Sequence, residues 1–382
     1  MAGLYFHIPF CRRRCNYCDF YFTTNTRLIE QFLDALSVEV VARAELFQDE
    51  IVDTIYFGGG TPSLLTAAQL ESILKNAEQH YRLASSLEIS LEANPEDITD
   101  AYLKDLANIG INRLSLGIQS FKSEKLHWLS RTHTAEKSQA AVECAKRHFQ
   151  NVSIDLIFGV ENESLTDWES ELRTALSFEL PHLSTYSLTI EPRTLLSKLI
   201  KQGKRQPPLD SLQADMFLLT MHVLRQYGYV HYEVSNFAQP HFQSQHNSSY
   251  WNRVPYLGFG PAAHSFVKTE RGEVRFANVA SLNTYLASPT DALLFQETLT
   301  EKDIFNETVL LGLRQEKGIN LSELAKKFRN LQAQLLKQYE EKVSTFVASG
   351  LLLQERSPAG DIIKLTDKGF TLADEIAESL FL

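Results

Sequence analysis

Cysteine is scarce in this 382-residue chain, which contains only four. Four are too few for the disulfide framework of a secreted protein of this length, and clustered cysteines in a reduced compartment more often bind metal or do redox chemistry. Long apolar runs are also missing, so the sequence predicts no membrane span. The first residues lack the basic flank, apolar stretch and cleavage site of a secretory signal, and we therefore expect a cytoplasmic protein.

An excess of positive charge is missing as well. The formal net charge is −10, and within 301–382 there are 11 Lys and Arg against 13 Asp and Glu. Proteins that bind nucleic acids usually present a basic face to the phosphates. We therefore expect no nucleic-acid partner. The hydrophobic fraction of 44% is that of a globular protein with an ordinary core.

Short apolar strands alternate with amphipathic helices through the first 235 residues. We predict strands at 4–8, 53–57, 87–93, 112–118, 152–158 and 183–190, and helices at 28–47, 67–81, 101–108, 134–148 and 165–178. Thr66 and Gln69 have the spacing of a capping box at one helix start. Strict alternation predicts βαβ units, a parallel sheet and hence an α/β fold. An α/β barrel and a doubly wound sheet both fit this pattern.

The remaining residues fall into two parts. Prolines and glycines recur in 236–297, which we expect to be a loop-rich connection. The pattern in 298–382 is helical with one short hairpin, which is typical of a winged-helix-like module. Because this module lacks a basic face, we expect a structural or protein-docking cap rather than a DNA-binding domain. The predicted organisation is therefore 1–235, 236–297 and 298–382.

Three of the cysteines, Cys11, Cys15 and Cys18, follow the first predicted strand with the spacing C-x3-C-x2-C. Structural zinc sites use four ligands, commonly from two C-x2-C knuckles, and no second knuckle is present. Cys144 lies mid-helix and is expected to be a packed residue. A [4Fe–4S] cluster held by three thiolates leaves one iron open to a small chelating ligand. The alternatives are a three-cysteine zinc site completed by a histidine such as His7, and chance clustering of the cysteines.

Polar side chains also stand at the carboxyl ends of the predicted strands. Glycines 58–60 end the second strand, but no lysine follows them, which excludes a phosphate-binding P-loop. Taken singly, polar residues at strand ends are more often caps or ion-pair partners. Together they mark the edge of a parallel sheet at which barrels and open sheets build their sites. These residues are Glu92, Gln119, Arg131 and Asp155.

The string HIPFCRRRCNYCDF resembles the radical S-adenosylmethionine (SAM) superfamily, and within it the oxygen-independent coproporphyrinogen III oxidase branch. The resemblance implies a partial (β/α)6 barrel in which three cysteines hold a [4Fe–4S] cluster and SAM chelates the fourth iron. It also implies an electron donor such as reduced flavodoxin or ferredoxin. The positions that match SAM contacts of the superfamily are Tyr5, Tyr17, Gly59, Gly60, Thr61, Glu92, Gln119, Arg131 and Asp155.

Two departures separate the chain from the oxidases. The oxidase loop resembles C-x3-C-x2-C-x-C, whereas here Phe20 stands where the last cysteine would be. The oxidases also carry a substantial extension before this loop, whereas only ten residues precede Cys11. Both departures favour a relative of the oxidases over a decarboxylase.

A second string, HNSSYW at 246–251, resembles the HNxxYW signature of HemW-type relatives, which bind heme and act as heme chaperones. An imidazole can ligate heme iron, and aromatic rings can stack on the macrocycle. A hydrogen-bonded packing histidine is the alternative. The heme candidates are His246, Asn247, Tyr250 and Trp251.

The preferred hypothesis is therefore a heme chaperone with three cofactors or ligands: a [4Fe–4S] cluster, SAM and heme. It would pass heme to an acceptor protein such as a respiratory enzyme. The alternative is an oxygen-independent coproporphyrinogen III oxidase, which oxidatively decarboxylates propionates. The sequence leaves open whether the chain is an enzyme.

Overall fold

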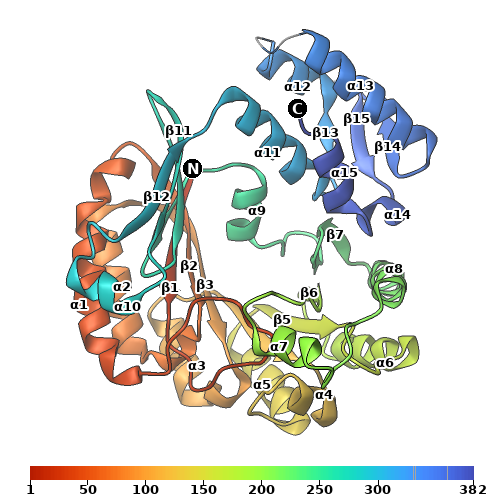
Figure 1. Cartoon of the computed structure of the whole chain (residues 1–382). Coiled ribbons are helices and arrows are strands. Elements are labelled where there is room, and N and C mark those ends of the chain that lie inside the picture. The colour runs from red at the N-terminus through yellow and green to blue at the C-terminus, as the bar shows by residue number, and fades with distance from the viewer. Residues whose placement is uncertain (330, 332, 359) are drawn as a thin grey trace.

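The computed structural model describes residues 1–329, 331, 333–358 and 360–382 (Figure 1). Parallel strands alternate with helices in the predicted order, and Figure 1 shows the helices along the outer face of a curved sheet. The strands are β1 (Ala2–Ile8), β2 (Ile51–Gly59), β3 (Arg82–Ala93), β4 (Arg113–Gln119), β5 (Asn151–Phe158) and β6 (His182–Ser187). The helices are α1 (Ile29–Ala42), α2 (Ala67–His80), α3 (Asp100–Asn108), α4 (Ser123–Trp128), α5 (Ala135–His148), α6 (Leu165–Leu176), α7 (Leu195–Lys201) and α8 (Asp210–Gln226). The predicted α/β fold is confirmed.

The main sheet is larger than predicted. Its order is β12-β11-β10-β9-β1-β2-β3-β4-β5-β6-β8-β7, so the parallel strands occupy the middle of a 12-stranded sheet. The added elements are β7 (Val230–Glu233), β8 (Asn236–Ala238), α9 (Gln245–Trp251), β9 (Tyr256–Phe259), β10 (His264–Thr269), β11 (Gly272–Asn278), α10 (Leu282–Ala287) and β12 (Leu293–Thr298). The expectation that 236–297 is mainly loop was therefore wrong. Its prolines stand between short strands, where they interrupt no ladder hydrogen bond.

The sequence signals at helix starts act as expected. The Thr66 hydroxyl oxygen accepts a hydrogen bond from the Gln69 amide at 3.2 Å, and the Gln69 side chain accepts one from the Thr66 amide at 2.9 Å. This is the predicted capping box of α2. It fixes where the chain leaves the glycine-rich end of β2 and turns into a helix.

The two faces of the parallel strands differ in polarity. On β1, Leu4, Phe6 and Ile8 are fully buried and pack toward the helices, and Phe6 stacks on Phe57 of β2 at 5.2 Å. The alternate residues face the other way because side chains alternate along a strand. On that inner face the later strands carry the polar residues Glu92 and Asp155. Strands buried against a core on both faces would be apolar throughout, so the alternation indicates a polar interior.

The C-terminal elements form the predicted helical module with a hairpin. They comprise α11 (Glu301–Leu313), α12 (Leu321–Lys327), α13 (Ala333–Ala348), α14 (Asp367–Phe370), α15 (Ala373–Ser379), and a small antiparallel sheet in the order β13 (Ile319–Asn320), β15 (Ile362–Leu365), β14 (Leu352–Glu355). In Figure 1, α9 lies between this module and the main sheet. Among the described residues, no helix is long and apolar enough to cross a membrane.

Candidate functional site

A cavity of about 630 Å³ lies at the carboxyl ends of the parallel strands. The loop after β1 contributes Cys11, Cys15 and Cys18 to its wall. The structure thus gathers residues from five strands and from the loops that follow them at one edge of the sheet, as the strand-end argument predicts. The other predicted residues that line the cavity are Tyr17, Gly59, Gly60, Thr61, Glu92, Gln119, Arg131 and Asp155.

Tyr5 is the one predicted SAM-contact position that is not among the lining residues. Its hydroxyl group lies 3.3 Å from Nδ1 of His7, and its ring stacks near Tyr56 with centroids 6.1 Å apart. Tyr5 therefore supports the layer of rings beneath the cavity and does not face the space itself.

Backbone hydrogen bonds close the cysteine loop on itself. The Cys11 amide donates to the carbonyl of Thr23 at 2.9 Å, which brings the end of the loop back beside its start. Polar groups reach two of the sulfur atoms: the Thr61 hydroxyl lies 3.5 Å from Sγ of Cys11, and Nη1 of Arg131 lies 3.6 Å from Sγ of Cys15. The third cysteine, Cys18, lines the same cavity.

The three cysteine thiols, which lie on one loop and line one cavity, fit an iron–sulfur cluster with one iron left open. Burial raises the pKa of the Cys11 thiol and raises that of Cys18 to about 11. These thiols are therefore protonated at neutral pH and must lose their protons when they bind metal. Cys144 is buried on α5, where its sulfur lies 3.4 Å from a carboxylate oxygen of Asp100, and it is not among the cavity residues. Its predicted packing role agrees with this position.

Glycine at the end of β2 allows close approach to the cysteine loop. A Cβ atom on Gly60 would lie 2.8 Å from the carbonyl oxygens of both Ile8 and Phe10. Gly59 has φ +104°, a conformation that favours glycine, and a Cβ there would collide with the His7 ring. The segment is therefore more than an ordinary turn, since it lets β2 press against the start of the loop while lining the cavity.

Two buried carboxyl groups face the interior from neighbouring parts of the sheet. Glu92 accepts hydrogen bonds from the Tyr56 hydroxyl at 2.9 Å and from the Gly59 amide at 3.1 Å. Asp155 accepts one from the Ser115 hydroxyl at 3.1 Å. Burial raises the pKa of Glu92 to about 7 and that of Asp155 to about 6. Both groups therefore change protonation state near neutral pH, and in their ionised form they can accept strong hydrogen bonds from a hydroxyl or ammonium group of a ligand.

The raised pKa of Glu92 predicts a pH-dependent stability. Between pH 4.5, its ordinary pKa, and about pH 7, the unfolded chain loses the proton while the folded chain keeps it. The free energy of unfolding should therefore fall by about 3 kcal/mol across this window and then level off. Glu92→Gln should remove the Glu92 share of this fall, so the free energy of unfolding of the reduced, cluster-free protein, measured in urea, should depend less steeply on pH between about 4.5 and 7 than in the wild type. As a comparison, Asp155→Asn should act only below about pH 6; an unchanged slope in E92Q would contradict the assignment.

Arg131 is oriented by residues that the sequence argument missed. Its Nη2 donates to the Gly117 carbonyl at 3.0 Å and to the Asn94 side chain, which in turn donates to the Thr61 hydroxyl at 3.2 Å. Asn94 also lines the cavity, as do Ser115 and Tyr186. Asn94 follows Glu92 by two residues in LEANPED, so it falls on the same side of the strand end. That period-two spacing could have identified it.

The HNxxYW segment forms α9, deep inside the curve of the sheet. The Glu88 carboxylate accepts hydrogen bonds from the backbone amides of Gln245 and His246 at 3.1 and 3.0 Å, which places a negative charge at the helix N-terminus. His246 is 1% exposed, and its two ring nitrogens lie 2.8 Å from the hydroxyls of Thr54 and Tyr250. Both positions that could ligate iron are therefore occupied by internal hydrogen bonds.

The other end of α9 contacts the C-terminal module. The Trp251 carbonyl accepts a hydrogen bond from Gln315 at 3.0 Å, and the Arg314 guanidinium lies 5.6 Å from the centre of the Trp251 ring. Asn247 and Trp251 are half-buried. The motif thus joins the inner wall of the sheet to the module, while the cysteine cavity lies at the opposite end of the strands.

Comparisons with known proteins identify the family. The Radical SAM superfamily matches residues 5–175, and the HemN C-terminal domain matches residues 299–372. Heme chaperone HemW from Lactococcus lactis subsp. lactis (strain IL1403) is 35% identical over 380 residues, covering 99% of this chain and 97% of that protein. The chain belongs to the HemW family. Its similarity to HemW from Bacillus subtilis (strain 168) is 33% identity over 98% of both chains.

A solved structure supports the same placement. Coproporphyrinogen III oxidase (HemN) from Escherichia coli, a radical SAM enzyme, aligns with a TM-score of 0.84 at 25% identity over 100% of this HemW-family chain and 90% of that chain. The resemblance to the radical SAM superfamily and its oxidase-like branch is therefore confirmed, as is the barrel fold with a helical C-terminal region. Superfamily membership implies a [4Fe–4S] cluster and SAM.

Proposed function

We propose that this chain is a heme chaperone that binds heme, a [4Fe–4S] cluster and SAM, and transfers heme to an acceptor such as a respiratory enzyme. The observation that carries the proposal is similarity to two heme chaperones along nearly the whole chain. The cavity with three cysteines and the HNxxYW helix support it from the structure.

In this proposal, Cys11, Cys15 and Cys18 hold the cluster. The cluster with its bound SAM supplies one-electron chemistry, with electrons from a donor such as reduced flavodoxin or ferredoxin. Glu92 accepts hydrogen bonds from the ligand, and Arg131 places a positive charge beside Cys15 and the space in front of it. The remaining proposed SAM contacts are Tyr17, Gly59, Gly60, Thr61, Gln119 and Asp155.

Heme binding is assigned to the α9 segment. Iron ligation by His246 would require its hydrogen bonds to Thr54 and Tyr250 to break, so it would be coupled to movement of α9. Heme titration of the wild type and of His246→Ala tests the assignment. We expect saturable binding by the wild type and an altered heme absorbance in H246A. An identical spectrum in both would move the iron ligand away from this imidazole.

An oxygen-independent coproporphyrinogen III oxidase is the second candidate, favoured by the alignment with the Escherichia coli enzyme. Against it, Phe20 stands at the cavity wall with 70% of its surface exposed, where the oxidases carry a further cysteine. The two candidates differ in one product. Anaerobic incubation of the reduced, SAM-loaded protein with coproporphyrinogen III should yield no protoporphyrinogen if the chaperone proposal is right.

The division into 1–235, 236–297 and 298–382 is proposed as a functional one. The first part would hold the cluster and SAM, and the second would supply the heme segment. The third would dock a protein partner. The contacts of Trp251 with Gln315 and Arg314 support communication between the second and third parts.

A further inference from the structure

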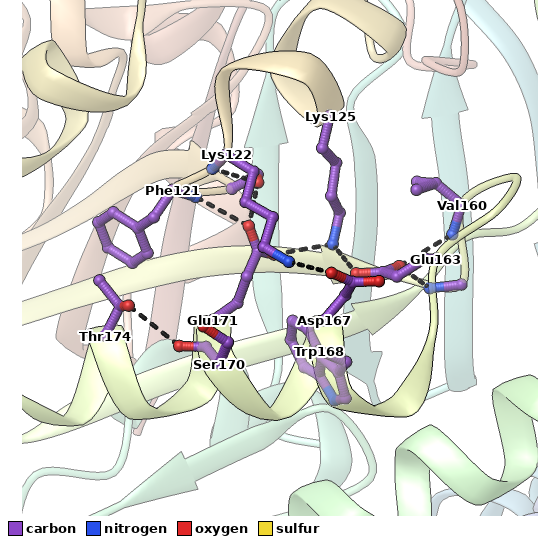
Figure 2. A network of polar contacts seen from close by, with 12 residues as sticks. Phe121, Lys122, Lys125, Val160, Glu163, Asp167, Trp168, Ser170, Glu171 and Thr174 are labelled. Carbon is purple, nitrogen blue, oxygen red and sulfur yellow. Dashed lines mark hydrogen bonds and ion pairs between the residues drawn. The ribbon is translucent and has the colours of Figure 1, made fainter.

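Three buried charged residues that are not part of the cavity wall lie in contact with one another (Figure 2). Lys125 of α4 extends between Glu163 and Glu171, contacting Oε1 of Glu163 and lying 2.8 Å from Oε2 of Glu171. The three side chains are 5%, 3% and 1% exposed. The ammonium group also lies 5.1 Å from the ring centre of Trp168. We call this group the Lys125 clamp.

The clamp carboxylates are also fixed to backbone groups. Glu163 accepts hydrogen bonds from the amides of Gly159 and Val160 at 2.7 and 3.1 Å, just after β5. Glu171 of α6 accepts one from the Phe121 amide at 3.1 Å, just after β4. The Lys125 clamp therefore ties the loops after two neighbouring strands to each other and to α6, as Figure 2 shows.

Stability alone does not account for such a group. Removing charges from water costs several kcal/mol per ion, and well-packed apolar residues are often as stabilising as a buried ion pair. The clamp adds a fixed position for the Lys125 side chain, because an ammonium group held between two anchored carboxylates can occupy only one place. The position of α4 is therefore fixed more narrowly than apolar packing would fix it.

Helix α4 directly contacts the cysteine loop. The Trp128 carbonyl at its end accepts a hydrogen bond from the Asn16 side chain at 2.6 Å, between two of the cysteines. Leu129, the next residue, is fully buried in a small apolar cluster against which Tyr17 packs. Two residues later, Arg131 reaches the sulfur of Cys15. The three contacts with the loop thus lie at or just beyond the C-terminal end of α4, within a few residues of Lys125.

We propose that the Lys125 clamp is a positioning device for the cofactor cavity. It holds α4 so that Arg131 and the cysteine loop keep the geometry that SAM binding requires. Lys125 acts through Arg131 and Asn16 and touches no cofactor itself. The inference rests on the proposed use of the cavity for a cluster and SAM, but it is independent of heme.

The test compares SAM affinity in reconstituted variants at equal iron content. Lys125→Met leaves two buried carboxylates without a cation and can destabilise the fold for that reason alone. It is therefore compared with the triple variant K125M/E163Q/E171Q, which carries no buried charge in the clamp and keeps oxygen acceptors for the backbone amides. Lys122→Met is the matched control, because Lys122, the residue just before α4, also pairs with a carboxylate of α6, Asp167, but the two side chains of that pair are 37% and 46% exposed.

We expect the dissociation constant for SAM, measured by equilibrium dialysis, to rise about 10-fold or more in both clamp variants. The change that SAM causes in the electron paramagnetic resonance spectrum of the reduced cluster should weaken in parallel, while K122M behaves as wild type. Wild-type affinity in the folded triple variant would overturn the clamp proposal alone. A wild-type protein that binds no SAM would overturn the proposed cofactor set together with the clamp.

Discussion

Cys15→Ala is expected to abolish both the iron content and the visible absorbance of the anaerobically reconstituted protein. Only three thiols line the cavity among the described residues, and a cluster that already leaves one iron for SAM cannot lose a further protein ligand and remain anchored. Arg131 would lose its sulfur partner at the same time. Iron analysis and the absorbance spectrum measure the loss directly.

Cys144→Ala is the matched control, because it removes the chain's one other thiol. Its sulfur lies on α5 beside Asp100, among packed side chains and outside the cavity wall. Iron content should stay at the wild-type level. Equal loss of iron in C15A and C144A would contradict the assignment of the cluster to the loop after β1.

Gly60→Ala is expected to lower the free energy of unfolding by about 3 kcal/mol and to reduce iron incorporation. The new methyl group would lie 2.8 Å from two backbone carbonyl oxygens, of Ile8 and Phe10, and neither can rotate away as a side chain could. Relief requires the end of β2 to separate from the start of the cysteine loop. Denaturant unfolding of the cluster-free protein and iron analysis after reconstitution measure the two effects.

Gly203→Ala separates steric overlap from the general cost of replacing a glycine. Gly203 has φ +69°, and a Cβ there meets no atom within 4 Å. It should cost only about 1 kcal/mol, from the backbone conformation, and leave iron incorporation unchanged. A G60A variant as stable and as iron-rich as G203A would contradict the close-packing account.

Much of the fold follows from local pattern. The alternation of apolar strands and amphipathic helices predicted β1 to β6 and the helices α1, α2, α3, α5 and α6, because each element buries one face of a regular segment, but it did not predict the short helix α4. The capping box at Thr66 and the cysteine spacing are local as well. These features could be predicted because they depend on residues close together in the sequence and not on contacts with distant parts of the chain.

The strands added to the edge of the sheet could not be predicted in the same way. Strands β9 and β12 are only four and six residues long, and β9 pairs in parallel with β1, about 250 residues away. A short strand beside a proline, such as β9, has almost the same local sequence pattern as a loop. It forms a strand because its backbone pairs with the edge of β1. The Lys125 clamp is equally non-local, since its members come from α4, the loop after β5 and α6.

The HNxxYW string shows a different limit. The residue types suggested a heme ligand, with a hydrogen-bonded packing histidine as the alternative, and the structure encloses the His246 ring between Tyr56 and Tyr250, with ring centroids 5.0 and 4.9 Å away. Burial lowers the pKa of His246 to about 3, so the imidazole is neutral and each nitrogen serves one hydroxyl. A short motif shows which residue types are present, but only the fold shows which of their atoms are free to bind a ligand.

The most direct test of the central claim is an anaerobic heme titration of the reconstituted protein, followed by addition of a heme-free acceptor. The account predicts saturable, stoichiometric binding seen in the heme absorbance, with C15A retaining heme if the two sites are separate, and transfer of the heme to the acceptor. Heme absorbance that rises without saturation, or bound heme that never leaves in the presence of acceptor, would contradict a heme chaperone.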